Sequence, residues 1–166
     1  MSDDKTPTDL SGAVEYPHPF DELVVELVRS ATRYVDILSP ALDHNVFDKG
    51  EMVAALSDLA RRSRQTRVRI LISDARAVVG RGHRLLQLAR RLPSTIIIQR
   101  LSDHPDWRGE TVVTRDRDGV AYRPAGSDSN GFYEPNSRAS ALPHLDQFEE
   151  LWRYSERDPN LRALQL

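Results

Sequence analysis

The 166-residue chain is 39% hydrophobic and 29% charged, which is ordinary for a globular protein, and it is long enough for one domain with its own core. The absence of cysteine excludes disulfides and thiolate chemistry, and no apolar run approaches the roughly 20 residues of a membrane-spanning helix. The acidic N-terminus lacks the apolar stretch of a signal peptide, so a cytoplasmic protein is expected.

The first 17 residues are polar and are expected to form a flexible arm ahead of a domain that covers residues 18–158. Within that domain, the spacing of apolar residues predicts helices that alternate with strands. In chain order these are a helix from about Asp21, a strand at 34–39, a helix at 51–62, a strand at 68–72, a helix at 82–91 and a strand at 95–99.

The second half of the domain has a different pattern. Two short β runs, 111–114 and 120–122, flank Asp118-Gly119 and predict a hairpin. Residues 124–140 are rich in Gly, Ser, Asn and Pro and predict a long loop before a last helix at 143–156. The tail, 159–166, either packs back through its leucines or frays. This order predicts an α/β fold, an α-β-α sandwich with a mixed, mainly parallel central sheet.

Positive charge is concentrated in one segment of an acidic chain. Between Arg61 and Arg100 there are eleven arginines and a single acid, Asp74, which leaves +10. Because the whole chain carries −2, everything outside this segment sums to −12. Part of the positive charge has a structural explanation, since cations are favoured at helix C-termini. The remainder predicts that the strand-helix-strand unit from Arg67 to Arg100 binds an anion.

Six residues are candidates for that anion site: Asp74, Arg76, Arg81, His83, Arg84 and Arg123. An imidazole and arginines at a helix N-terminus suit an anion, and Asp74 ends a strand where open α/β sheets place ligands. The alternatives are a His83 that caps or packs locally and an Asp74 that pairs with Arg76 or caps a turn. The remaining histidines show no metal-ligand spacing, so neither a zinc site nor a cofactor is expected.

The hairpin and the segment after it resemble one half of the phospholipase D superfamily. In that family a strand carries His-x-Lys, followed by an Asp-Gly turn and then by Gly-Ser and Asn. Here the corresponding residues are Thr111, Val113, Asp118, Gly126, Ser127 and Asn130. Thr111 and Val113 replace the His and the Lys, so the resemblance implies the fold without the nucleophile of a phosphoryl-enzyme intermediate.

A more specific resemblance is to an uncharacterised bacterial domain of the same type, which stands alone or follows an acetyltransferase-like domain. Its marks are the segments 82–94, 118–124, 148–152 and 158–164. It implies a fold and an acetyltransferase-like partner but no activity. The superfamily pairs two such halves across one cleft, so the single half here implies a homodimer, with a monomer as the alternative.

Two classes of function follow. The first is a non-catalytic module that binds phosphate-containing ligands or regulates a partner. The second is an enzyme acting on phosphodiesters or phosphorylated small molecules, with His83 in place of the lost His. Nucleic-acid binding through the basic unit is a variant of the first class, and the negative net charge and the lack of a basic-aromatic strand platform weigh against it.

Overall fold

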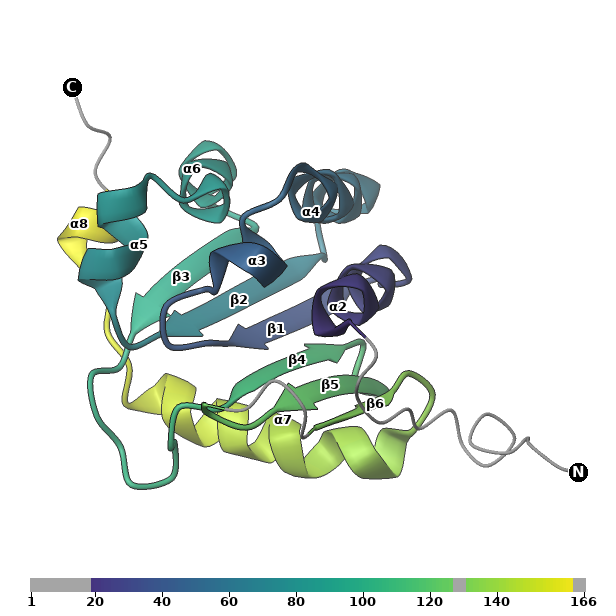
Figure 1. The fold of residues 1–166 in the computed structure, drawn as a ribbon. Coiled ribbons are helices and arrows are strands. Elements are labelled where there is room, and N and C mark those ends of the chain that lie inside the picture. The colour runs from purple at the N-terminus through teal and green to yellow at the C-terminus, as the bar shows by residue number, and fades with distance from the viewer. Residues whose placement is uncertain (1–18, 127–130, 163–166) are drawn as a thin grey trace, which may run out of the picture.

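The structure is a computed structural model that describes residues 19–126 and 131–162. Within that part of the chain, six strands form one mixed sheet in the order β3-β2-β1-β4-β5-β6 (Figure 1). The strands are β1 (Tyr34–Leu38), β2 (Arg67–Ile72), β3 (Ile96–Arg100), β4 (Thr111–Arg115), β5 (Gly119–Arg123) and β6 (Phe132–Glu134). The helices are α2 (Phe20–Arg29), α3 (His44–Phe47), α4 (Gly50–Arg62), α5 (Ala75–Arg81), α6 (Arg84–Arg91), α7 (Arg138–Arg153) and α8 (Pro159–Arg162).

The sheet has a parallel half and an antiparallel half. Strands β1, β2 and β3 pair in parallel, because each is followed by a helical crossover before the next. Strand β4 pairs antiparallel with β1 and turns directly into β5, which pairs with β6. The predicted α/β class and the mixed sheet are therefore confirmed.

Two hydrophobic clusters lie on opposite faces of the sheet. Helices α2, α3, α4, α5 and α6 cover one face, and α7 runs across the other (Figure 1). The larger cluster includes Leu86 from α6, and the smaller includes Leu151 from α7; both leucines are buried, as the helical spacing predicts. No helix among the described residues is long and apolar enough to span a membrane.

Four local predictions are corrected. The helix predicted at 82–91 is α6, which begins at Arg84 after the His83 cap, and a separate helix that was not predicted, α5, precedes it and ends where Gly82 adopts a left-handed conformation (φ 65°). Strand β6 lies inside the predicted loop 124–140, and α7 begins at Arg138 rather than at 143. Between β1 and α4, the short helix α3 was not predicted.

The tail packs back in its first half. Helix α8 follows an isolated bridge between Arg100 and Glu156, and Leu161 is buried. Leu164 and Leu166, and the arm at residues 1–17, lie outside the described residues.

Candidate functional site

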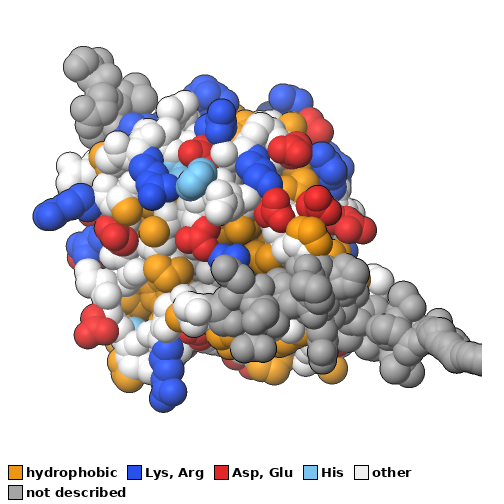
Figure 2. All heavy atoms as spheres, viewed as in Figure 1, with side chains coloured by type: hydrophobic (Ala, Val, Ile, Leu, Met, Phe, Trp, Pro, Cys, Tyr) orange, Lys and Arg blue, Asp and Glu red, His pale blue; other side chains and the backbone are white. Residues whose placement is uncertain are grey.

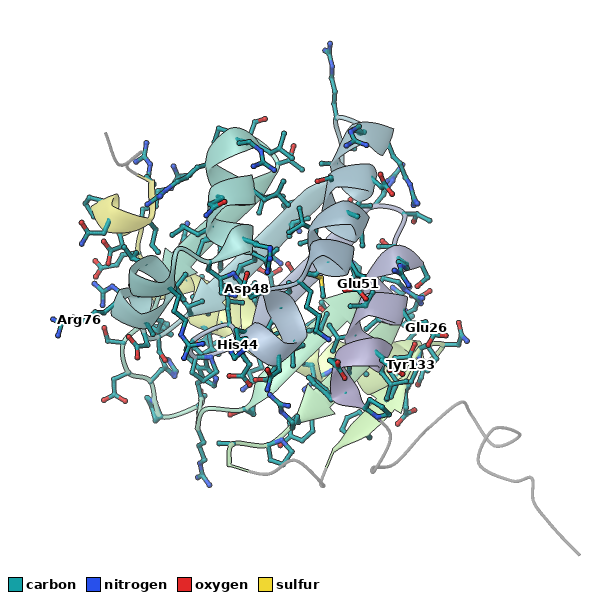
Figure 3. The ribbon with its side chains drawn as sticks, turned by 45° about the horizontal axis from the view of Figure 1, so that its top comes forward. Glu26, His44, Asp48, Glu51, Arg76 and Tyr133 are labelled. Atoms are coloured by element: carbon teal, nitrogen blue, oxygen red, sulfur yellow. The ribbon has the colours of Figure 1, made fainter. Side chains whose placement is uncertain are left out.

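The six predicted anion-site residues do not converge. Asp74 caps α5 by accepting a hydrogen bond from the Ala77 backbone N–H (3.0 Å). Arg76 is exposed, and no described residue pairs with its side chain. Both residues line a cavity of about 490 Å³ between α5 and α8. Figure 3 shows Arg76 pointing away from the protein, well separated from His44 and Asp48.

His83 has a structural role. Its ring is fully buried, with Nε2 2.9 Å from the Leu42 carbonyl oxygen and Nδ1 accepting the Leu85 backbone N–H at 3.1 Å. These partners assign the Nε2–H tautomer. Burial lowers the pKa of His83, so the ring is neutral at physiological pH. Neither ring nitrogen is therefore free to bind a ligand. His83 caps α6 and packs locally, which was the alternative to an anion-binding role.

The two arginines that flank His83 are held by α3 and its surroundings. Arg81 lies 3.0 Å from His44 Nδ1. Arg84 donates to the Asp48 backbone oxygen at 2.8 Å, and its own backbone N–H donates to the Asp48 carboxylate at 3.0 Å. On the face seen in Figure 2, cationic and acidic side chains are interspersed rather than gathered into one basic patch.

Arg123 lies in a different place, at the end of the hairpin. There a cavity of about 380 Å³, the hairpin pocket, opens at the carboxyl end of β1; it is lined by Pro40, Asp43, Gly109, Thr111, Arg123, Pro124, Ala125 and Gly126. The Arg123 side chain is 15% exposed, and its guanidinium pairs with the Asp43 carboxylate and lies 4.7 Å from the centre of the Phe20 ring.

The positions that the sequence matched to the phospholipase D motif lie along the same hairpin. Thr111 begins β4 opposite Arg123 and is buried at the wall of the hairpin pocket. Val113 is fully buried in the larger hydrophobic cluster. Asp118 lies in the β4–β5 turn at the other end of the hairpin, where it accepts a hydrogen bond from Arg115 at 2.7 Å. Gly126 lines the pocket, whereas Ser127 and Asn130 lie outside the described residues.

One buried network of charged residues was not predicted from the sequence. Arg69, one of the arginines of the basic segment between Arg61 and Arg100, donates to the buried Asp36 (2.8 Å) and to Glu149 on α7 (2.6 Å). Its guanidinium also lies over the rings of Phe148 (4.9 Å) and Trp152 (5.5 Å). The charge of Arg69 therefore fixes α7 to the sheet and is unavailable to a ligand.

Asp116 was missed as well. Its carboxylate accepts hydrogen bonds from the backbone N–H groups of Thr32, Arg33 and Tyr34 at 2.7–2.8 Å. Burial opposes ionisation, but these hydrogen bonds prevail and lower the pKa of Asp116. Asp116 therefore fixes the β4–β5 turn to the segment between α2 and β1.

The described residues contain no group of three or more His, Asp or Glu that could hold a metal ion.

Solved structures with this fold include two phospholipase D family members. Nuc from Salmonella typhimurium matches 88% of this chain and 97% of its own at 17% identity (TM-score 0.59), and NucT from Helicobacter pylori matches 88% and 97% at 11% identity (TM-score 0.55). The archaeal chromatin protein TrmBL2, described as showing a novel mode of DNA binding, matches 93% of this chain at 10% identity (TM-score 0.63). This chain spans only 56% of the TrmBL2 chain.

At these identities the likeness concerns the fold alone, and it agrees with the phospholipase-D-like sandwich that the hairpin indicates. No protein of curated function matches the sequence. The family comparison covers nearly the whole chain, since the profile described as a domain of unknown function, DUF7931, matches residues 16–164. The chain therefore belongs to the DUF7931 family.

Proposed function

We propose that this protein is a non-catalytic phospholipase-D-like module that binds a phosphate-containing anion in the hairpin pocket. The observation that carries the proposal is the position of Arg123. It brings a guanidinium into a cavity whose wall includes Thr111, the residue at the motif's His position. Of the six candidates in the sequence, Arg123 is the one that lies beside the degenerate motif.

The residues at the motif positions favour binding over catalysis. A threonine hydroxyl cannot act as the nucleophile of a phosphoryl-enzyme intermediate without a neighbouring base. Val113 is buried in the core, so it offers no donor to a phosphate. An enzyme that used His83 instead would need a free ring nitrogen, and both nitrogens already have partners. Bis-p-nitrophenyl phosphate should therefore be hydrolysed no faster by the wild type than by Thr111→Ala.

Asp43 weakens anion binding in this proposal, because its carboxylate competes with the anion for Arg123. An incoming anion must share Arg123 with this carboxylate, which is 49% exposed and can turn towards solvent. Two like charges about 4 Å apart repel by roughly 1 kcal/mol in water and by more near a protein surface. Removing the carboxylate should therefore strengthen anion binding, whereas removing the guanidinium should abolish it.

The test is a titration with inorganic phosphate, read by isothermal calorimetry and by thermal shift, on the wild type and two variants. Asp43→Asn should bind phosphate about fivefold more tightly or better, as a change of 1 kcal/mol implies. Arg123→Gln should show no saturable binding. For every variant that binds, higher salt should weaken the interaction.

Arg76→Gln is the matched control, because it removes the same charge from a different cavity and should leave phosphate binding unchanged. If Arg123→Gln binds phosphate as the wild type does, the hairpin pocket is not the site. If Arg76→Gln abolishes binding instead, the anion lies between α5 and α8.

The proposal includes the partners that the family resemblance implies, a second copy of this chain across the hairpin pocket and an acetyltransferase-like domain. It leaves out nucleic-acid binding by the Arg67–Arg100 unit as a whole. Arg69, Arg84 and Arg100 of that unit are bound to acids of the same chain, so the unit does not present its charge on one surface.

A further inference from the structure

Six arginines in or next to three separate loops lie at the end of the sheet opposite the hairpin pocket. Two are in or next to the α2–β1 connection, three are in or next to the α4–β2 connection and one is in the β4–β5 turn. They are Arg29, Arg33, Arg62, Arg64, Arg67 and Arg117, here called the arginine surface. Figure 1 shows the ends of α2 and α4 and the tip of β4 at the same end of the molecule as the amino ends of β1 and β2.

Contacts between residues of the three loops hold them together. The Arg67 backbone N–H donates to the Arg33 carbonyl at 2.9 Å, and the Arg62 guanidinium donates to the Ala31 carbonyl. The guanidinium groups of Arg67 and Arg117 lie 5.3 Å and 5.8 Å from the centre of the Tyr34 ring. The three loops are therefore neighbours in space, although Arg33 and Arg117 are 84 positions apart in the sequence.

Acids lie near this surface without forming ion pairs with its arginines: Asp116 accepts the Arg33 backbone N–H, and the charge of Asp36 acts on Arg67. Within the described part of the chain, none of the six arginines forms an ion pair, and Arg62 is bound to a neutral carbonyl. Glu149, whose charge acts on both Arg67 and Arg117, is already bound by Arg69. The Arg67 Nε is buried without a hydrogen-bond partner among the described residues.

The surface is also held in place before any partner arrives. Asp116 accepts three backbone N–H groups of the α2–β1 connection, and its own backbone N–H donates to the Tyr34 carbonyl at 2.8 Å. The β4–β5 turn and the α2–β1 connection are thus fixed to each other. Binding would have to order the arginine side chains but not these loops, which lowers its entropic cost.

The chemistry of the surface fits phosphate groups spaced along a backbone. Protein interfaces need apolar anchors, and the exposed large hydrophobic residues in the described part of the chain, Leu142 and Tyr154, both lie towards α7 instead. Guanidinium groups bind phosphate oxygens in a planar, bidentate geometry. Nucleic acids present such groups in a row, and their binding is dominated by these contacts.

We infer that the arginine surface binds the phosphate backbone of a nucleic acid, without reading its sequence. This site is independent of the hairpin pocket. Thr111 and Arg123 lie at one end of the β4–β5 hairpin, and Arg117 lies at the other, so five residues of strand, or about 15 Å, separate the two sites.

The test uses the full chain and two fluorescein-labelled probes of mixed sequence, a 12-base-pair DNA duplex and a single-stranded 12-mer, with binding read by fluorescence anisotropy. The test variant, Arg33→Gln/Arg64→Gln/Arg117→Gln, removes one exposed arginine from each loop. It should bind duplex at least about tenfold more weakly at low salt, because each neutralised phosphate contributes to affinity. The slope of log K against log salt should become shallower by about 2.7.

The matched control is Arg76→Gln/Arg91→Gln/Arg157→Gln, which changes the net charge equally but uses exposed arginines outside the surface. It should bind duplex nearly as the wild type does. If both triple variants lost the same affinity for the duplex, the loss would be due to net charge alone, and the inference would be overturned. A wild type that binds neither probe at 50 mM salt, or one that binds poly-L-glutamate more tightly than DNA, would overturn it too. Arg123→Gln should leave DNA binding unchanged, which separates this result from the phosphate titration.

Discussion

The buried Arg69 network offers the sharpest test of how the structure is held together. Asp36 and Arg69 are 5% and 7% exposed at their side chains, and Glu149 reaches them from α7. Arg69→Met keeps an unbranched side chain at this position but removes the guanidinium, and with it both hydrogen bonds to Asp36 and the contacts with the Phe148 and Trp152 rings. A buried carboxylate then remains without its cation.

The expected cost follows from that burial. Breaking a buried ion pair by removing one partner typically costs about 3–5 kcal/mol, because the remaining charge is neither solvated nor paired. Glu149 is 56% exposed, so its carboxylate can return to water and adds little. A double variant, Arg69→Met/Asp36→Asn, removes the stranded charge and should recover about 2 kcal/mol of the loss.

The measurement is urea unfolding of the wild type and both variants between pH 4 and pH 7. Burial raises the folded-state pKa of Asp36 above its ordinary value of 3.8, and loss of Arg69 raises it further. A raised carboxyl pKa means that stability is lost as the pH rises through the interval between the unfolded and folded values. The deficit of Arg69→Met should therefore grow from pH 4 to pH 7. A pH-independent deficit, or a double variant less stable than the single one at pH 7, would refute this reasoning.

Three further outcomes are expected. Asp116→Ala should lower the free energy of unfolding by about 2–3 kcal/mol, since three backbone N–H groups lose their acceptor. The control Asp106→Ala, at an exposed position, should leave the free energy of unfolding unchanged. Because the pKa of Asp116 is lowered in the folded protein, its contribution to stability should disappear as the pH falls below about 4. Leu86→Ala and Leu151→Ala should each cost about 2–5 kcal/mol, against little change for Leu142→Ala, which is 42% exposed. Light scattering should give twice 18.8 kDa for the homodimer, and a mass of 18.8 kDa with and without phosphate would exclude the paired-cleft arrangement.

The elements that the sequence predicts best are those with a long run or a regular spacing of apolar residues. Strands β2 and β3 and helix α4 lie within a residue of their predicted bounds, and α2 begins within a residue of its predicted start. Helix α3 and strand β6 span four and three residues, too few for a period to be visible. Gly82 was taken as a helix start because a glycine at a helix boundary does not by itself say which side the helix is on.

The site residues were harder to predict because their partners are distant in the sequence. Arg69 is 33 residues from Asp36 and 80 from Glu149. One local signal was present, since Asp36 interrupts an otherwise apolar strand and a buried carboxylate requires a cation. His83 illustrates the opposite error: a histidine among arginines suggests an anion site, yet its two nitrogens serve the backbone of the same chain.

The arginines show why charge along a sequence is a poor guide to charge on a surface. The segment from Arg61 to Arg100 carries +10, but its members are distributed over both faces and both ends of the sheet, and several are neutralised by acids from outside the segment. Arg67, by contrast, lies beside distant loops, since its backbone N–H donates to the Arg33 carbonyl and its guanidinium shares the Tyr34 ring with Arg117. Electrostatic attraction of a polyanion depends on cations that share one surface within about a Debye length, roughly 10 Å at 0.1 M salt. A fold that brings loop ends together creates that proximity, and a count along the chain does not measure it.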